Sequence, residues 1–233
     1  MLALAIDTST DIAGLALANE DKLISELNFR HKMDLLQRLM PNVDRLISDA
    51  GMKQSDLDAL VVSLGPGSFT GLRIGMAAAK SIAHVLGKPI MGVPTMDVLA
   101  ESAAAACPKS IVTAIHARPG DVFWSLFRCE AGKLAKVVED EASTVEEMLE
   151  RACQEDQIVF CGDGVERNRA IIEQKCGPDS ILPQWYHFPR ASVLVSLGIR
   201  RLLRGESDDL FSLTPRYVRK PTPVIRLETG KYE

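Results

Sequence analysis

The chain has 233 residues, of which 46% are hydrophobic and 25% charged, as in an ordinary globular protein. This length allows one or two domains and buries enough apolar surface to fold without disulfides or a structural metal. The formal net charge of −4 is too small to mark a nucleic-acid-binding protein by bulk electrostatics. Disordered, collagen-like and disulfide-scaffold proteins are excluded.

Charge is unevenly distributed along the chain. Residues 200–233 carry 8 basic and 5 acidic side chains, against 19 and 26 in the rest. This segment is therefore either a solvated tail or a contact to phosphate or an acidic partner.

Five cysteines without a C-x-x-C pair or a leader segment are typical of reduced thiols in the cytoplasm. No apolar run approaches the ~20 residues of a membrane span. We therefore expect a cytoplasmic protein that makes no membrane contact.

The first half of the chain predicts an α/β unit. Strands are expected at residues 2–6, 12–18, 23–29, 57–64 and 90–93, and helices at 31–50, 70–87 and 95–106. The first two strands form a hairpin around a polar turn, Asp7–Asp11. Pro41 lies inside the first apolar helical stripe and is expected to kink or split that helix.

The second half repeats this order of elements. A strand, a turn and a strand are expected within 111–127, then strands at 134–138 and 158–161, and helices at 145–153 and from Val165. The break at 107–110 divides the chain into an N-terminal lobe, 1–107, and a C-terminal lobe with a basic tail, 108–233. The sequence leaves open on which lobe the apolar and basic helix 192–204 packs. The repeated order predicts duplication of one α/β unit.

The segment Gly65–Gly75 carries the most information. A glycine turn between a strand and a helix presents N–H groups that favour an anion, but the sequence GPGSFTGLRIG matches neither GxGxxG nor a P-loop. Small side chains also let another backbone approach closely. One helix face therefore contacts either its own lobe or a partner chain, and the apolar helix 31–50 adds to it. That face comprises Gly71, Gly75, Ala78, Ala79 and Ile82.

Catalytic clusters are sparse. The four histidines are far apart, without an H-x-x-x-H or H-E-x-x-H pair, and no G-x-S-x-G elbow occurs. We therefore expect no metal centre and no catalytic nucleophile. Asp7, at the end of the first strand, either holds Mg²⁺ and phosphate or closes the hairpin as an Asx turn. The matching residue of the second hairpin is His116.

Three segments resemble the bacterial TsaB (YeaZ) family: Asp7-Thr8-Ser9, the glycine segment and Pro215–Arg219. The resemblance runs over nearly the whole chain and implies the two-lobed, duplicated ASKHA fold of actin, Hsp70 and the sugar kinases. Family members act in forming N6-threonylcarbamoyladenosine (t6A) at position 37 of ANN-decoding tRNAs. The resemblance implies an inactive paralogue of the catalytic TsaD subunit. Such a paralogue is a scaffold that works with TsaD and the ATPase TsaE, can pair with itself, and meets tRNA through the complex. The chain departs from the family at His116, where an aspartate is usual.

The resemblance also implies roles for particular residues. The helices that begin at His31 and Thr70 form the surface for TsaD or a second copy, and a bulky residue at Gly75 is expected to block pairing while leaving the fold intact. The expected interface residues are Leu36, Met40, Val43, Gly71, Ile74, Gly75, Ala78, Ala79 and Ile82. Vestigial nucleotide contacts, with at most weak affinity for ATP, ADP or Mg²⁺ and no resident cofactor, are expected at Asp7, Thr8, Ser9, Gly65 and Gly67. Contacts of the tail to tRNA or the partner are expected at Arg216, Tyr217 and Arg219.

Two alternative functions remain open at this point. The first is an ASKHA-type ATPase or small-molecule kinase that uses Asp7 and the glycine turns. The second is direct tRNA binding by basic residues of the C-terminal segment, which would depend steeply on salt. These residues are Arg200, Arg201, Arg204, Arg216, Arg219 and Lys220.

Overall fold

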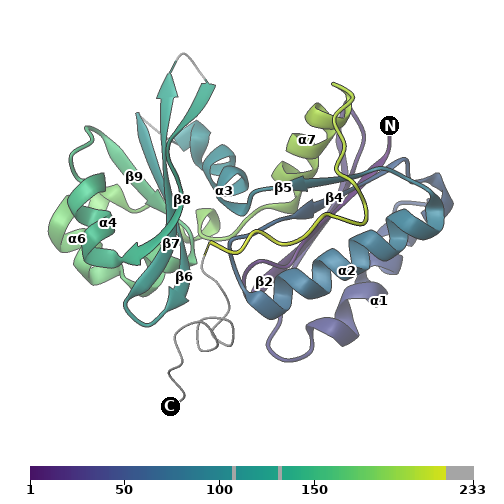
Figure 1. Cartoon of the computed structure of the whole chain (residues 1–233), viewed down its shortest axis with the longest axis horizontal. Helices are drawn as coiled ribbons and strands as arrows, with labels where there is room; N and C mark the ends of the chain where they lie inside the picture. Colours follow the sequence, from purple (N-terminus) through teal and green to yellow (C-terminus); the bar gives the residue numbers. More distant parts are fainter. Residues whose placement is uncertain (107–108, 131–132, 219–233) are drawn as a thin grey trace.

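The computed structural model describes residues 1–106, 109–130 and 133–218, which form two α/β lobes side by side (Figure 1). The sheet of the first lobe has the order β3-β2-β1-β4-β5. Its strands are β1 (Ala3–Asp7), β2 (Ile12–Ala18), β3 (Leu23–Arg30), β4 (Ala59–Ser63) and β5 (Ile90–Val93). The first three strands are antiparallel neighbours, and β4 and β5 run parallel to β1. The predicted hairpin and third strand are confirmed.

Opposite faces of this sheet carry side chains of different size. Leu4 and Ile6 of β1 face the helices α1 (Leu35–Asp49) and α2 (Phe69–Leu86). Ala3 and Ala5, which alternate with them along the strand, face α7 (Ala191–Leu202) on the other side (Figure 1). The helix α7 lies close to this face, and a Cβ on its Gly198 would collide with the side chain of Val61.

The second lobe repeats the first. Its strands are β6 (Ser110–Arg118), β7 (Asp121–Glu130), β8 (Lys133–Thr144) and β9 (Ile158–Cys161), in the order β8-β7-β6-β9. As β1 does in the first lobe, β6 pairs antiparallel with the next strand and parallel with the strand that precedes a glycine turn. Its helices are α4 (Val145–Ala152), α5 (Asp163–Arg167) and α6 (Arg169–Cys176). The predicted duplication is confirmed.

The two lobes exchange helices, which corrects the predicted boundaries 1–107 and 108–233. From the first half of the chain, α3 (Thr95–Ala103) places Met96 and Leu99 in the core of the second lobe. From the second half, α7 packs on the first sheet, and Arg216 beyond it donates its N–H to the carbonyl oxygen of Leu64 at 2.7 Å. A break in the sequence pattern marks a connection but does not show on which sheet an apolar helix packs.

The helix α1 is continuous, so the predicted split at Pro41 is wrong. Its apolar stripe is buried against the sheet over its whole length. This burial outweighs the backbone hydrogen bond that a proline removes. Gly51, with φ of +71°, follows the helix as predicted.

Short 3₁₀ turns complete the fold, namely η1 (Gln54–Asp56), η2 (Ala104–Ala106), η3 (Pro178–Ser180) and η4 (Gln184–Tyr186). No helix within the described ranges is long and apolar enough to cross a membrane.

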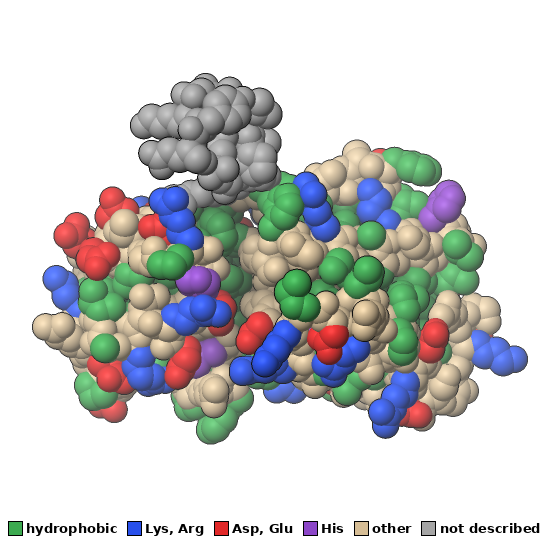
Figure 2. Space-filling view, turned by 90° about the horizontal axis from the view of Figure 1, so that it is seen from below, with side chains coloured by type: hydrophobic (Ala, Val, Ile, Leu, Met, Phe, Trp, Pro, Cys, Tyr) green, Lys and Arg blue, Asp and Glu red, His purple; other side chains and the backbone are tan. Residues whose placement is uncertain are grey.

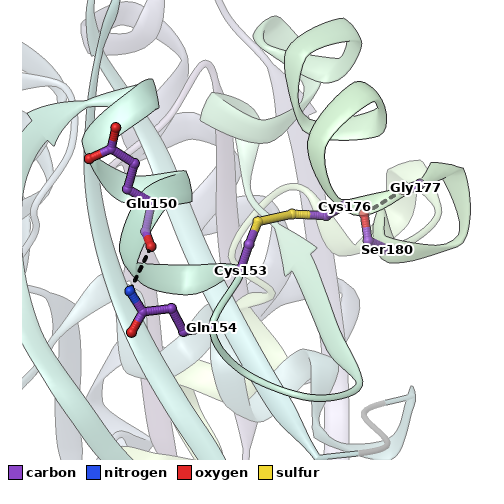
Figure 3. Close-up of a disulfide and its surroundings, with 6 residues drawn as sticks. All are labelled: Glu150, Cys153, Gln154, Cys176, Gly177 and Ser180. Carbon is purple, nitrogen blue, oxygen red and sulfur yellow. Dashed lines mark hydrogen bonds between the residues drawn. A yellow bond between two sulfur atoms is a disulfide. The ribbon is translucent and has the colours of Figure 1, made fainter.

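Cys153 and Cys176 form a disulfide that joins the ends of α4 and α6 (Figure 3). The two cysteines are 23 residues apart in sequence and are brought together by the packing of the two helices on the second sheet. The prediction that all the cysteines are reduced is therefore wrong for this pair. Cys129 and Cys161 are free thiols, and Cys107 lies outside the described residues.

Candidate functional site

A cleft of about 1050 Å³ separates the two lobes. The turn between β1 and β2, the start of α2 and the C-terminal segment near Tyr217 line it from the first lobe. His116 near the end of β6 and Asp163 and Arg167 of α5 line it from the second. Figure 2 shows acidic, basic and histidine side chains gathered along the seam between the lobes.

The glycine segment packs on the β1–β2 turn of its own lobe. Ser68 donates its N–H to the carbonyl oxygen of Ser9 at 2.7 Å, and the Thr8 hydroxyl donates to the carbonyl oxygen of Gly71 at 2.8 Å. A Cβ at Gly71 would collide with the Thr8 carbonyl oxygen, and one at Gly75 with the Thr8 hydroxyl. Gly71 and Gly75 therefore admit the chain's own turn, and their small size is explained without a neighbouring subunit.

The predicted interface residues divide into two groups. Four are buried within the first lobe and have no surface to offer a partner, namely Val43, Gly71, Gly75 and Ala79. The other five line a surface groove of about 460 Å³ between α1 and α2, namely Leu36, Met40, Ile74, Ala78 and Ile82. Leu36 is 71% exposed and Met40 37% exposed, so the groove is the part of the predicted surface that a partner can reach.

The expected nucleotide contacts divide in the same way. Asp7 and Thr8 are fully buried, Gly65 is buried beneath Leu72, and only Ser9 and Gly67 line the cleft. The Oδ1 atom of Asp7 accepts the Ser9 N–H at 3.0 Å and the Ser9 hydroxyl at 2.8 Å, which is the Asx turn foreseen as one of its two roles.

These residues do not fit a magnesium-bound nucleotide. Asp7 has no surface in the cleft, and its Oδ1 is already used by Ser9. No group of acidic, histidine or cysteine side chains in the described part of the chain is placed to hold a metal ion. The Oδ1 atom of Asp7 therefore serves to close the β1–β2 turn.

The pKa of Asp7 makes this role testable. Burial raises the pKa to about 6 from 3.8, against the opposing effect of the Ser9 hydrogen bonds. The native state holds this proton more tightly than the unfolded chain, so the Asp7 contribution falls as pH rises from about 4 to about 6 and then levels off. The loss amounts to about 3 kcal/mol.

Asp7→Asn is expected to remove this fall, because asparagine keeps an acceptor for Ser9 and does not ionise. Thermal melts of the wild type and the variant between pH 4 and pH 7 check it. The variant should gain stability relative to the wild type across that interval. Parallel melting curves over the whole range would show that Asp7 ionises in the fold as it does in the unfolded chain.

The second lobe reproduces the glycine-turn packing with different chemistry. A Cβ at Gly162 would collide with the carbonyl oxygen of Ala114, much as Gly67 lies against Ser9. His116 donates its N–H to Asp163 Oδ1 at 3.0 Å. Burial, together with the charge of Arg167, lowers the pKa of His116, so its imidazole is neutral at pH 7. Where the first hairpin has the carboxyl group of Asp7, the second therefore has an uncharged ring.

The C-terminal segment adds aromatic and cationic groups to the cleft. Arg73 lies over the Phe69 ring, with its guanidinium carbon 3.9 Å from the ring centroid, and donates from Nε to the Tyr217 hydroxyl at 3.1 Å. Tyr217 and Arg216 therefore reach the cleft, while Arg219 lies outside the described residues. Sequence reasoning missed Phe69, Arg73 and Arg167, because nothing in the sequence pattern shows that they face a common space.

The three arginines at the end of α7 form ion pairs within the chain, with two carboxylates shared among them. Arg200 pairs with Glu101 at 2.7 Å, and Arg201 and Arg204 pair with Glu206 at 2.8 and 3.7 Å. The alternative of tRNA binding through these arginines therefore loses three of its six cations. Of the others, Arg219 and Lys220 are among the residues left undescribed.

The amino-acid sequence of this chain is similar to those of known proteins. A family model described as TsaD, tRNA N6-adenosine threonylcarbamoyltransferase, matches residues 32–221. The tRNA threonylcarbamoyladenosine biosynthesis protein TsaB of Bacillus subtilis is 34% identical over 221 residues, which cover 94% of each chain. The protein of the same description from Escherichia coli is 31% identical over 156 residues, 66% of this chain and 67% of that relative.

Solved structures agree along the length of the chain. A Pseudomonas aeruginosa protein described as uncharacterized, with similarity to peptidase YEAZ, superposes with a TM-score of 0.79 at 27% identity, covering 94% of this chain and 99% of that one. YeaZ from the same species gives a TM-score of 0.78 at 26% identity, covering 93% and 99%. The duplicated ASKHA fold expected from the sequence is confirmed.

Proposed function

Because the chain belongs to the TsaB (YeaZ) family of tRNA threonylcarbamoyladenosine biosynthesis proteins, we propose that it is a non-catalytic scaffold subunit in t6A formation. In this role it pairs with a TsaD-type catalytic subunit in the cytoplasm, works with a TsaE-type ATPase, and supports modification at position 37 of ANN-decoding tRNAs. The TsaD-type subunit carries the chemistry, and this chain holds it in a productive arrangement.

The α1–α2 groove is the observation that supports this proposal. Apolar side chains from both helices line it, and Leu36 stands 71% exposed on its rim. Figure 2 shows hydrophobic side chains running along the face of the first lobe where these helices lie. A groove of this kind is a favourable centre for a protein interface, where buried apolar anchors carry most of the binding energy. The same groove would join two copies when the partner is absent.

The burial of Asp7 weighs against the kinase alternative. In that alternative Asp7 must reach a bound magnesium ion, and its carboxyl group has no surface in the cleft. Purified chain is therefore expected to show no ATP turnover, and Asp7→Asn to change stability rather than activity.

Reconstitution tests the proposal. Purified TsaD-type and TsaE-type subunits, ATP, the threonylcarbamoyl donor and an ANN-decoding tRNA are combined with and without this chain, and t6A is measured by mass spectrometry of the digested tRNA. We expect t6A only in the mixture that contains the chain. Equal modification without it would contradict the scaffold role, and ATP turnover by the chain alone would favour the enzyme alternative.

A further inference from the structure

We infer that the cleft between the lobes binds a single-stranded segment of RNA through cationic and aromatic side chains supplied by both lobes. Stacked rings and unpaired guanidinium groups recognise bases and backbone phosphates without reading sequence. The choice of RNA over DNA rests on the proposed function. The geometry that carries the rest of the inference is independent of any partner subunit.

Unpaired positive charge is concentrated in the cleft. Five lysine and arginine side chains line it against two carboxylates. Arg73, Arg167 and Arg216 make no close ion pair with any residue that the structure describes, although Arg167 acts on Asp163 and Arg216 on Asp97 from farther away. Arg200 and Arg201 of α7, in contrast, pair directly with Glu101 and Glu206. A phosphate group is therefore expected to bind in the cleft rather than at the basic helix α7.

Arg73 is held in an orientation that suits a phosphate. Its Nε is occupied by the Tyr217 hydroxyl at 3.1 Å, and its planar group stacks on Phe69. The two terminal nitrogens remain for the paired oxygens of a phosphate. The Phe69 and Tyr217 rings are 5.2 Å apart and partly exposed, and both border the cleft with Phe123 of the second lobe. Such rings offer stacking surfaces for bases.

Three main-chain donors beside the cleft are already used within the chain. The Ser9 N–H bonds to Asp7, the Ser68 N–H to the Ser9 carbonyl oxygen, and the Gly71 N–H to the Ser68 hydroxyl. Triphosphate sites rely on backbone groups of this kind, whereas the five cations of this cleft are side chains, which suit a phosphodiester backbone.

The cleft continues into a second cavity of about 440 Å³. The two share Asp11, Arg30, Asp163 and Arg167, and the second is bordered by Trp185, 63% exposed. Together the two spaces exceed the ~300–1000 Å³ of a site for one small molecule.

Three carboxylates face this path, and each has a partner within the chain. Asp11 lies 3.7 Å from Arg30, and Glu166 is bonded to Arg169 at 2.8 Å. Asp163 accepts the His116 N–H, and burial raises its pKa. The five lysine and arginine side chains of the cleft outnumber these carboxylates, so the path keeps an excess of positive charge.

Fluorescence anisotropy with the full chain and a labelled ten-nucleotide single-stranded RNA of mixed sequence tests the inference over 50–300 mM KCl. Arg167→Ala with Arg216→Ala, two cleft arginines that do not border the α1–α2 groove, is expected to weaken binding about tenfold or more. The slope of log affinity against log salt should flatten by about 1.4, since each phosphate contact on a single strand contributes about 0.7. The matched control, Arg200→Ala with Arg204→Ala, is expected to bind within twofold of the wild type.

Several outcomes would overturn the inference. They are an unchanged salt slope in the cleft variant, an equal loss in the α7 control, or binding of ATP with magnesium in place of RNA. The four arginines are exposed or partly exposed, and melting temperatures confirm that the variants fold. Pairing with the TsaD-type subunit is measured on the same variants and should be unchanged, so failure of RNA binding is separate from failure of the scaffold role.

Discussion

Gly71→Ala is expected to destabilise the chain, although alanine forms helices better than glycine by about 1 kcal/mol. The added methyl group meets the carbonyl oxygen of Thr8, which is backbone and cannot rotate away. Overpacking of this kind typically costs ~1–3 kcal/mol, and a collision with backbone lies at the upper end, so we expect a net loss of about 2 kcal/mol. That corresponds to a melting temperature lower by about 4–8 °C.

Gly75→Ala supplies the companion measurement. Its methyl group meets the Thr8 hydroxyl, and without that oxygen the nearest atom is the Thr8 Cβ at 3.2 Å. Thr8→Ala should therefore recover part of the loss in the double variant, as a positive coupling in a double-mutant cycle. Ala77→Leu, on the exposed side of α2, is the control and should change stability little. A higher melting temperature for Gly71→Ala than for the wild type would contradict the prediction, because it would mean that the added methyl group meets no other part of the chain.

Leu36→Asp combined with Ala78→Asp is expected to abolish pairing with the TsaD-type subunit. Both side chains line the α1–α2 groove, and Leu36 is largely exposed in the chain alone, so the isolated variant should fold. In the complex the new carboxylates would be buried in an apolar contact without partners, which costs ~2–5 kcal/mol. We expect Kd to rise about 100-fold or more by calorimetry, with a parallel loss of t6A formation.

Val85→Asp is the matched control for this prediction. Val85 lies on α2, as Ala78 does, is 82% exposed and does not border the groove. Its substitution should leave both pairing and t6A formation unchanged. Equal loss of pairing in the control, or retained pairing in the groove variant, would place the partner on another surface.

Much of the fold follows from residue patterns. Alternating and helical periodicities locate most of the strands and helices, and Gly51 and Gly87 mark the ends of α1 and α2, both with positive φ. The duplication follows from the repeated order of elements. The exchange of α3 and α7 does not, because an apolar stripe records that a helix face is buried but not which sheet buries it. The disulfide likewise depends on where two helix ends meet.

The candidate sites were predictable only in part. Small residues at 71 and 75 indicate that another part of the protein approaches α2 closely, and only the folded structure identifies it as Thr8. Leu36 and Met40 were foreseen on the contact surface, and they line the groove. The cationic cleft was not foreseen, because Arg73 and Arg167 come from different lobes and converge only in the folded chain.

Hydrogen–deuterium exchange tests the scaffold account most directly. The amides of the chain are followed by mass spectrometry alone and after saturation with the TsaD-type subunit, with exposed β8 residues as an internal reference. The account predicts that protection appears in α1 and in the first three turns of α2 around Ile74 and Ala78, while β8 is unchanged. Formation of the complex with unaltered exchange in both helices would contradict it.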